Sequence, residues 1–357
     1  KARPINSGMC WPTYWLSKWI DAQLQPLVNK HIPTHFKDTS ALLRLLVGKT
    51  FPASAVFLAG DVSSLYPSIP NEEGLAALQR FLQQHAQQEN IKPEIVQMIV
   101  EGMRIILENN VCAFDGKHWL QLIGTAMGTP AAVMYAIIFM HDQETALAET
   151  FTHEEKAAEL VKQRFVDDLF KIVSCKEHAQ SIMHAHSRMH SNIKIEWQPI
   201  SRKCVFMDVE LALAPAGANP FDDNYNDNNS SNEQLILHFR PYHKPNNSFR
   251  YLPADSFHPP HTMRSWIRSV AIALAEHSCT WSHFSKAIIF FYHKLRRQRY
   301  SKRMIRKIFA EVNYDQRRIT AAPAAIAAAA QPVQQARKTA TARPLIIKIK
   351  YGLVASH

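Results

Sequence analysis

The sequence has few cysteines and no long apolar run. Its five cysteines are scattered over 357 residues, and no two have the Cys-x-x-Cys spacing of a zinc ribbon. We therefore expect neither a disulfide framework nor a cysteine-based zinc site, and the chain suits a reducing, intracellular compartment. No apolar stretch reaches the roughly 18 to 20 residues that cross a bilayer, so no membrane partner is expected.

Acidic residues are also in the minority. Asp and Glu number 30 against 41 Lys and Arg, which gives a formal net charge of +11. Such an excess suits a polyanionic partner, and nucleic acid is the commonest one. On charge alone, a basic protein without such a partner remains the alternative. The hydrophobic share of 46% and the charged share of 20% exclude a fully disordered chain.

The beginning of the chain lacks three expected features. It opens Lys-Ala-Arg-Pro without an initiator methionine, a signal segment or a transit segment. We therefore expect that an N-terminal part is missing. The remaining length is enough for two or three subdomains around a sizeable core.

Hydrophobic periodicity predicts alternating helices and short strands. Helices are expected over 16–27, 39–47, 71–88, 93–108, 130–148 and 178–190, followed by two or three basic helices over 263–312. Strands or hairpins are expected over 55–62, 111–122, 163–173, 194–197, 205–213 and 235–252. The Asp115-Gly116 pair predicts the turn of the second of these.

Two segments interrupt this order. Residues 214–234 contain an Asp/Asn/Ser tract with almost no core-forming residues, a composition typical of a disordered polar insertion. Residues 320–343 are rich in Ala, Pro and Gln and predict a linker, and residues 344–357 predict a C-terminal strand or tail.

Three aspartates form the first candidate site. Asp61 ends an apolar run, and an aromatic residue, Tyr66, follows five positions later. A lone acid in such a place is most often a cap or a turn residue. The adjacent pair Asp167 and Asp168 lies between apolar β-formers. Like charges raise each other's pKa and burial penalises both, so a cation is the usual reason for such a pair; a surface β-turn is the alternative.

One aspartate and an Asp-Asp pair are the ligands that two-metal phosphoryl transfer requires. Two divalent ions roughly 3.5 to 4 Å apart share carboxylates, activate an attacking 3′-hydroxyl and stabilise the leaving pyrophosphate. Mg²⁺ suits hard oxygen ligands and keeps positions open for substrate phosphates, and Mn²⁺ is the alternative ion.

A glycine-containing segment lies between the acids. Gly124-Thr-Ala-Met-Gly-Thr-Pro130 places two glycines before a predicted helix, which lets backbone approach a substrate closely. Alone it is weak evidence, because Gly-Thr-Pro is a common turn.

Taken in order, these segments resemble a known family. Residues 61–70, 124–130 and 165–168 resemble polymerase motifs A, B and C of reverse transcriptases. Their sequences are most similar to those of the Penelope-like retroelements. Three further segments resemble parts of that family. Arg3-Pro4-Ile5 resembles the second fingers block, and 206–209 resembles the primer-grip turn. Residues 242–245, followed by 256–262, resemble the start of the thumb. The resemblance covers nearly the whole chain outside the insertion and the linker.

The resemblance implies an α+β right-hand polymerase fold with an antiparallel-sheet palm flanked by helices, partial fingers and a helical thumb. The implied division is partial fingers and the entry to the palm over 1–60, the palm with motifs A to E over 61–213, the insertion over 214–234, the basic helical thumb over 235–319, the linker over 320–343 and the tail over 344–357.

The resemblance also implies roles for single residues. Asp61, Asp167 and Asp168 would be catalytic and, with the backbone of Val62, would hold two Mg²⁺ ions. Tyr66 would be the steric gate that excludes a 2′-hydroxyl. The other nucleotide-binding positions would be Arg3, Ser63, Ser64, Leu65, Gly128, Thr129 and Pro130, and the primer grip would be Phe206, Met207 and Asp208. Contacts to the nucleic-acid backbone would come from Arg296, Arg297, Arg299, Lys302, Arg303, Arg306 and Lys307.

The implied function is an RNA-templated DNA polymerase that uses an RNA template, a DNA primer and dNTPs, in the nucleus or, alternatively, an organelle. Two other functions stay open: a domesticated RNA-binding subunit of a larger ribonucleoprotein, and an RNA-templated RNA polymerase or terminal transferase. The chain departs from the family pattern in three ways. The first fingers block would lie before residue 1, Gly124-Thr125 stands where many reverse transcriptases have Gln-Gly, and no GIY-YIG nuclease sequence follows the thumb.

Overall fold

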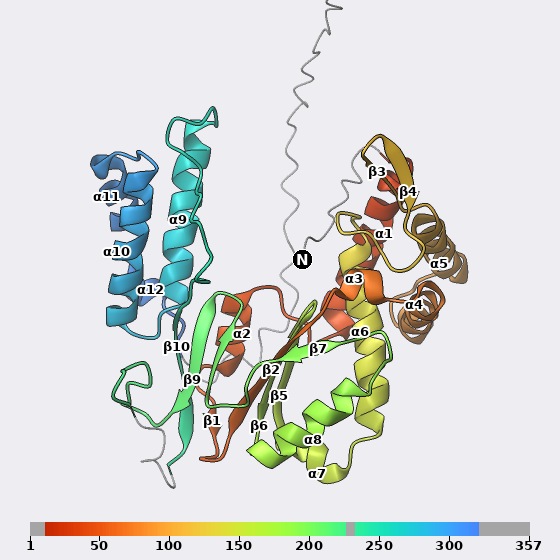
Figure 1. Cartoon of the computed structure of the whole chain (residues 1–357), viewed down its shortest axis with the longest axis horizontal. Helices are drawn as coiled ribbons and strands as arrows, with labels where there is room; N and C mark the ends of the chain where they lie inside the picture. Colours follow the sequence, from red (N-terminus) through yellow and green to blue (C-terminus); the bar gives the residue numbers. More distant parts are fainter. Residues whose placement is uncertain (1–10, 226–232, 321–357) are drawn as a thin grey trace, which may run out of the picture. The chain divides into compact units, whose positions relative to one another are not determined.

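The computed structural model of the chain describes residues 11–225 and 233–320 (Figure 1). Within these ranges, helices combine with three sheets whose neighbouring strands are antiparallel. This mixture confirms the expected α+β class. Arg3 and the C-terminal tail lie outside the described residues, as does all of the predicted linker but its first residue.

The first sheet has four strands in the order β5-β6-β2-β7. Their bounds are β2 Val56–Val62, β5 Glu159–Phe165, β6 Asp168–Val173 and β7 Ile195–Trp197. Because side chains alternate across a strand, Phe57 and Ala59 share one face of β2 while Leu58 lies on the other. The first face packs against α2 (Thr39–Leu46) and the second sheet, and the other against α8 (Lys176–Ser187). Asp61 continues the face of Phe57 and Ala59.

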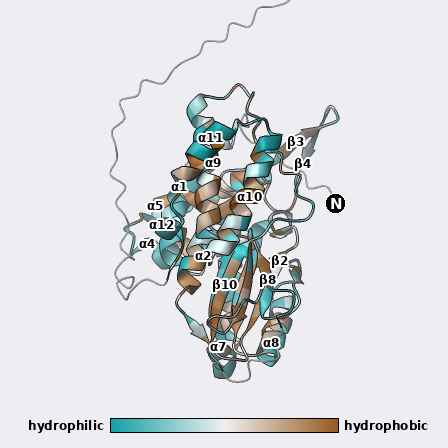
Figure 2. Ribbon diagram, turned by 90° about the vertical axis from the view of Figure 1, so that its left-hand side faces the viewer, coloured by the Kyte–Doolittle hydropathy of each residue, from teal (hydrophilic) through white to brown (hydrophobic). Residues whose placement is uncertain are grey.

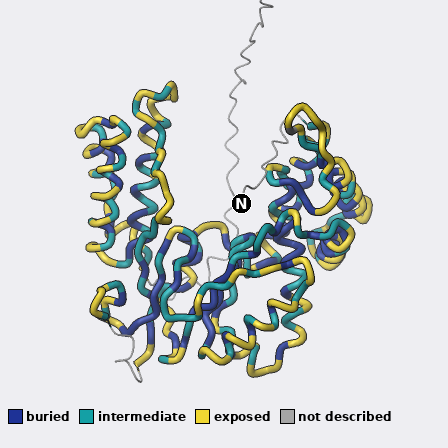
Figure 3. The backbone as a smooth tube through the Cα atoms, in the orientation of Figure 1, coloured by how far each residue is buried: buried dark blue, intermediate teal, exposed yellow. Residues whose placement is uncertain are grey.

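Four helices form the largest core with one end of this sheet. They are α1 Tyr14–His31, α4 Asn71–Ala86, α5 Pro93–Glu108 and α6 Ala132–Glu149. Each coincides, within a few residues, with a helix predicted from apolar spacing. Val62 and Leu169 reach this core from β2 and β6 and are almost fully buried. The strand ends that carry the acids are therefore anchored by the packing of these neighbouring side chains. Figure 3 shows that buried backbone segments run through the sheets and the helices around them.

The second sheet has the order β1-β10-β9-β8. Its strands are β1 Thr50–Phe51, β8 Lys203–Phe206, β9 Val209–Ala214 and β10 Leu235–Pro241. The prediction of one strand over 205–213 is wrong, because the chain reverses at Met207 and Asp208. Met207 has a φ of +53°, and β8 pairs with β9 across this turn. The turn contains neither glycine nor proline, so the alternating apolar pattern appeared to run through it.

The C-terminal helices have a core of their own. They are α9 Pro260–Glu276, α10 Trp281–Arg297, α11 Lys302–Ala310 and the short α12 Tyr314–Arg317. Ile267, Phe291 and Leu295 are buried among them. The side chains of Thr280 and Ser301 cap α10 and α11 by accepting from backbone amides three residues on. The first three, α9 to α11, match the two or three helices that the sequence predicts over 263–312.

The remaining elements are short. They are α3 Leu65–Ser68, α7 His153–Ala158 and the hairpin of β3 Val111–Phe114 with β4 Lys117–Leu120. The hairpin turns at Asp115 and Gly116, both with positive φ, as the sequence predicts. No helix within the described ranges is long and apolar enough to span a bilayer.

Residues 215–225 form the described first half of the predicted polar insertion. They lie in turns, with backbone bonds such as Asp222 N to Asn219 O at 3.2 Å. The Phe221 ring lies 4.6 Å from the guanidinium of Arg240 and 5.3 Å from the ring of His283. This half therefore contacts β10 and α10; residues 226–232 lie outside the described ranges.

Candidate active site

The three aspartates meet at one end of the first sheet. Asp61 of β2 and Asp168 of β6 are directly opposite each other in the antiparallel pair. The amide of Val62 donates to the carbonyl of Asp167 at 3.0 Å, which continues the ladder by one residue. Opposed residues point to the same face with Cβ atoms about 4.5 to 5.5 Å apart, so the sheet register brings the predicted acids together. We call Asp61, Asp167 and Asp168 the acidic edge.

The hairpin between β5 and β6 differs in detail from the prediction. Its turn was expected to hold both aspartates. Instead, Val166 and Asp167 form the two-residue turn, and Asp168 is the first residue of β6, opposite Phe165. Val166 has a φ of +52°. A β-branched residue rarely adopts the left-handed region, so this turn is locally strained.

The acidic edge concentrates negative charge in a half-buried place. Burial, together with the charges of Asp167 and Asp61, raises the pKa of Asp168 to about 6, while Lys244 opposes the shift. Asp61 and Asp167 are also half-buried. Repulsion between the carboxylates therefore acts on the fold unless a proton or a cation offsets it.

The donor chemistry of the acidic edge fits magnesium. Carboxylate oxygens are hard ligands, and the crowded negative charge that shifts the Asp168 pKa is what a divalent cation would neutralise. In residues 11–225 and 233–320, no three His, Cys, Asp or Glu side chains are grouped as a metal site. The acidic edge therefore fits Mg²⁺ in the type of its donor atoms, in its charge and in its position at the end of the sheet.

The chain after Asp61 turns sharply into α3. Ser63 is held by β7 and the residue before it. Its amide donates to Lys194 O at 2.8 Å, and its hydroxyl donates to Glu196 Oε1 of β7 at 2.5 Å. Ser64 has a φ of +55°, and Leu65 is buried in the core below. This places a bent backbone segment next to the acidic edge, where the sequence predicts nucleotide contacts.

Tyr66 lies close to the acids. Burial, together with the negative charge of Asp167, raises the pKa of its phenol to about 12. The ring is half-buried. Tyr66 therefore stays a neutral phenol at physiological pH, beside the acidic edge.

The glycine-containing segment is locked to this region through its backbone. The amide of Thr125 donates to Tyr66 O at 2.9 Å. Gly124 has a φ of +76°, and a Cβ there would lie 2.3 Å from the same carbonyl oxygen. Only glycine fits this position, because both the backbone conformation and the space exclude a side chain.

The other three predicted residues of this segment precede α6. Gly128 is exposed and has a φ of +109°, and Thr129 and Pro130 are partly exposed. Ala131 donates its amide to the Ser17 hydroxyl of α1 at 3.0 Å, which satisfies one orphan amide at the start of α6. The segment is thus accessible and anchored on both sides.

The predicted primer-grip residues form the β8–β9 turn. The Phe206 ring packs 4.9 Å from Phe170 of β6, which joins the two sheets below the acidic edge. Asp208 accepts a hydrogen bond from the Thr39 hydroxyl, and its carboxylate lies 3.4 Å from Nδ1 of His277. Its carbonyl accepts from the amide of Tyr242 at 2.8 Å. Asp208 therefore links α2, the end of α9 and the segment after β10.

A buried ion pair was missed by sequence reasoning. Arg164 and Glu144 are both almost fully buried, with Nε of the arginine 3.2 Å from Oε2 of the glutamate. The same guanidinium donates to the carbonyl of Val166 in the hairpin turn at 2.8 Å. Little in the sequence pointed to it, because β5 contains two other charged residues, Glu159 and Lys162, so Arg164 does not stand out from its neighbours.

Seven basic residues lie at the end of α10, in the link that follows it and in α11, and all seven are exposed. We call them the basic cluster: Arg296, Arg297, Arg299, Lys302, Arg303, Arg306 and Lys307. Figure 2 shows α11 as mainly hydrophilic. Arg296 donates to the Tyr300 carbonyl, and Arg299 pairs with Asp255 at 3.2 Å. The helices' apolar sides face their own core, so the cluster faces solvent.

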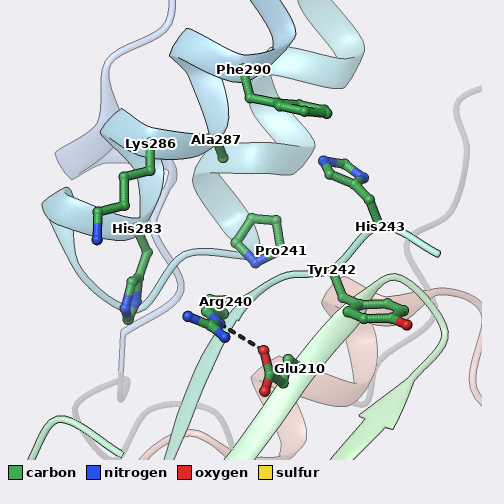
Figure 4. Close-up of a pocket in the computed structure, with 9 residues that line it drawn as sticks. All are labelled: Glu210, Arg240, Pro241, Tyr242, His243, His283, Lys286, Ala287 and Phe290. Carbon is green, nitrogen blue, oxygen red and sulfur yellow. Dashed lines mark hydrogen bonds and ion pairs between the residues drawn. The ribbon is translucent and has the colours of Figure 1, made fainter. Parts of the chain in front are cut away.

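A cavity of about 340 Å³ lies between the ends of β9 and β10 and the helix α10 (Figure 4). Arg240 pairs with Glu210 at its floor, 2.7 Å from Nε to Oε2. His243 stacks on Phe290 at 5.1 Å between ring centroids. Of the lining residues, only Tyr242 and His243 fall in a segment that sequence reasoning singled out, the start of the predicted thumb. They adjoin the β8–β9 turn, because the amide of Tyr242 donates to Asp208 O.

Comparisons with known proteins give partial matches. The family model described as the animal helix-turn-helix domain matches residues 250–310, which include α9 to α11. No curated protein matches the sequence. The Penelope-like assignment stays a prediction.

Three solved telomerase structures are similar to the chain. Telomerase from Candida albicans with a TWJ fragment of telomeric RNA is 10% identical, with a TM-score of 0.48 over 83% of this chain and 48% of that one. The corresponding complex from Candida tropicalis is 12% identical, with a TM-score of 0.44 over 83% and 45%. The C-terminally truncated apo telomerase from Candida tropicalis is 13% identical, with a TM-score of 0.41 over 57% and 44%. The chain thus spans less than half the length of these telomerases.

Proposed function

We propose that this chain is the catalytic core of a reverse transcriptase that extends a DNA primer on an RNA template. The observation that carries the proposal is the acidic edge. Strand register places Asp61 opposite Asp168, and Asp167 adjoins both in the hairpin turn. Their order in the sequence, with the Gly124 segment between them, is that of reverse-transcriptase motifs A, B and C.

The acidic edge and the carbonyl of Val62 would hold two Mg²⁺ ions, with Mn²⁺ as the alternative. Bound there, the ions would favour the nucleophilic form of the primer 3′-hydroxyl and offset the charge of the departing pyrophosphate. The fit rests on the oxygen donors and on the crowding of carboxylates, whose charges add to the effect of burial in raising the pKa of Asp168. Asp61 and Asp168 come from two paired strands, and their register supports the proposal because it holds these two carboxylates side by side.

The residues around the acidic edge would bind the incoming dNTP. The bent backbone of Ser63, Ser64 and Leu65 offers amides for the triphosphate, and Gly128, Thr129 and Pro130 would shape the base pocket. The Tyr66 ring would lie under the sugar and collide with a 2′-hydroxyl. Its position is fixed from the Gly124 side, because Thr125 holds the Tyr66 carbonyl at 2.9 Å.

Two further surfaces would hold the primer and template. The β8–β9 turn of Phe206, Met207 and Asp208 would support the primer end, since Phe206 packs directly under β6. The basic cluster would follow the phosphate backbone without reading sequence. In this proposal residues 61–213, which hold most strands of the two sheets, form the palm, and residues 235–319, with α9 to α11, form the thumb. The resemblance to nuclear retroelements favours the nucleus.

The decisive experiment is extension of a DNA primer on an RNA template with magnesium. We expect extension by the wild-type chain and none by the double variant Asp167→Ala/Asp168→Ala. Asp115→Asn, in the exposed turn of the β3–β4 hairpin, is the matched control and should extend normally. Equal and negligible extension by wild type and double variant, with RNA binding retained by both, would refute the polymerase proposal. That outcome would favour the RNA-binding subunit of a ribonucleoprotein.

A further inference from the structure

Arg164 occupies an unusual position beneath the acidic edge. It lies in β5, two residues before the hairpin turn, and its side chain is 1% exposed. Its guanidinium donates to three acceptors: Val166 O at 2.8 Å, Ile137 O at 3.0 Å and Glu144 Oε2 at 3.2 Å. These acceptors belong to the turn itself and to α6, so one side chain joins the two.

Burying a guanidinium is costly, which indicates a specific reason for it. An unpaired buried charge costs several kcal/mol, and the cost is offset only by an opposite charge and complete hydrogen bonding. Glu144, 4% exposed, supplies the charge. Although burial acts to raise the pKa of Glu144, the positive charges of Arg164, Lys162 and Lys171 lower it overall, so the glutamate remains ionised. The planar fork of arginine then has donors left for the two backbone carbonyls.

The bond to Val166 O acts on a strained peptide. Val166 has a φ of +52°, a conformation that its branched side chain disfavours. The carbonyl of Val166 lies in the same peptide plane as the amide and Cα of Asp167. Holding that oxygen therefore sets the orientation of the unit from which the Asp167 carboxylate projects.

The backbone of Arg164 is held as firmly as its side chain. Its amide donates to Thr34 O at 2.8 Å, and its carbonyl accepts from the Phe36 amide at 3.4 Å. These bonds fix the outer edge of β5 to the segment between α1 and α2. The base from which the guanidinium reaches the turn is thus itself anchored.

We propose that Arg164 is a positioning residue that sets the place of Asp167 through the Val166 carbonyl, with Glu144 as its buried counterion. The catalytic consequence rests on the proposed polymerase function; the structural consequence does not. Misplacing a reacting group by about 1 Å can cost roughly a hundredfold in rate, so loss of this bond should act on the chemical step.

Lys171 offers a matched control in the same hairpin. It is as deeply buried as Arg164, but its ion pair is with Glu159, at the end of β5 farthest from the turn. Replacing Lys171 removes a buried cation of similar cost without removing a bond to the turn. A general loss of stability and a loss of positioning can therefore be separated.

The test compares Arg164→Lys, Arg164→Met and Lys171→Met with wild type, using folded protein at a temperature where each variant is native. In primer extension, we expect Arg164→Met to lower kcat about a hundredfold and to raise the Mg²⁺ concentration for half-maximal rate, with KM for the template–primer unchanged. Arg164→Lys keeps the positive charge but loses the planar guanidinium and its several N–H donors, so its kcat should be intermediate. Lys171→Met should keep both kcat and the Mg²⁺ requirement.

Amide hydrogen exchange of residues 165–169 provides a readout that needs no activity. Exchange should be faster in Arg164→Met than in Lys171→Met, because only the first variant releases the turn. Equal exchange in the two variants, or a kcat and Mg²⁺ requirement in Arg164→Met equal to those of Lys171→Met, would overturn the proposal. If wild type shows no extension, the polymerase proposal fails and hydrogen exchange alone decides this one. If Arg164→Met does not fold, the same comparisons are made with Arg164→Lys.

Discussion

The acidic edge and the basic cluster differ in how their charges are held. Asp61, Asp167 and Asp168 are half-buried at the ends of paired strands, and a buried arginine holds the turn between β5 and β6. The residues of the basic cluster are exposed on two helices, with their apolar neighbours turned to a separate core. Backbone hydrogen bonds fix the first set, whereas long flexible side chains present the second.

This difference predicts how each region responds to change. At the acidic edge a few atoms must be in fixed places, so single substitutions there should have large effects. In the basic cluster the attraction is shared among many side chains and screened by salt, so single substitutions should have small effects. Each prediction below sharpens or breaks this contrast.

The largest effect after loss of the acids themselves is expected at Tyr66. Tyr66→Ala removes the ring that would exclude a 2′-hydroxyl, so the preference for dNTPs over NTPs should fall on the order of a hundredfold. Tyr66→Phe keeps the ring and should keep the preference. The measurement is single-nucleotide incorporation of matched dNTP and NTP. Equal use of both nucleotides by wild type would instead favour an RNA polymerase or terminal transferase.

A second prediction concerns the contact between Gly124 and Tyr66. Gly124→Ala adds a Cβ 2.3 Å from the Tyr66 carbonyl, whereas Gly116→Ala, also at a positive φ, adds one into open space. Both changes carry the left-handed penalty of about 1 to 2 kcal/mol. Crowding should cost Gly124→Ala a further 1 to 3 kcal/mol or so in unfolding free energy. Equal losses in urea unfolding would show that Gly124 is not packed against Tyr66.

A third prediction follows from the raised pKa of Asp168. Because its pKa of about 6 in the folded chain is above the ordinary value of 3.8, the folded chain binds this proton more tightly than the unfolded chain. The protonated carboxyl therefore stabilises the fold fully below about pH 4, and this contribution is lost as pH rises through 6.

Asp168→Asn should accordingly be more stable than wild type at pH 8 in EDTA. The gain should be on the order of 1 kcal/mol after allowance for solvent screening of a half-exposed group, and it should vanish near pH 4. Urea unfolding at several pH values measures it, with Asp115→Asn as control. A wild type more stable than Asp168→Asn at pH 8 would mean that the ionised Asp168 carboxylate does not destabilise the fold through burial and repulsion.

The smallest effects are expected from single residues of the basic cluster. Arg303→Ala, Arg306→Ala or Lys307→Ala should each weaken binding of an RNA–DNA duplex a few-fold. Each substitution that removes a cation from a phosphate should also reduce the slope of log Kd against log salt by about 0.9. Lys176→Ala, on the exposed side of α8, is the control. A single variant that abolishes binding would contradict the distributed character of the cluster.

Local signals in the sequence predicted much of the fold. Apolar spacing located α1 and α2, and the Asp115-Gly116 pair located a hairpin because its positive φ values suit these residues. The ends of β2 and β6 were predicted by apolar runs that stop at acids. Their meeting was inferred from family resemblance, and the register of the sheet now shows it directly.

Other features depend on contacts between distant residues. The turn at Met207 and Asp208 is set by sheet pairing and by Thr39, 169 positions away from Asp208. No local residue preference reveals it, and only the resemblance to the primer-grip turn indicated it. Arg164 is explained only by Glu144 and Ile137 of α6, which the fold brings beneath the hairpin. Sequence spacing cannot show such a partner.

The most direct test of the account asks whether substitutions at the acidic edge change kcat while substitutions in the basic cluster change KM. Single-turnover and steady-state extension would be measured for Asp61→Asn and for the triple variant Arg303→Ala/Arg306→Ala/Lys307→Ala. We expect Asp61→Asn to lower kcat about a thousandfold, equivalent to about 4 kcal/mol, with little change in KM for the template–primer. The triple variant should raise that KM steeply with salt and leave kcat nearly unchanged. A fall in kcat for the triple variant as large as that for Asp61→Asn, or normal kcat in Asp61→Asn, would contradict the account.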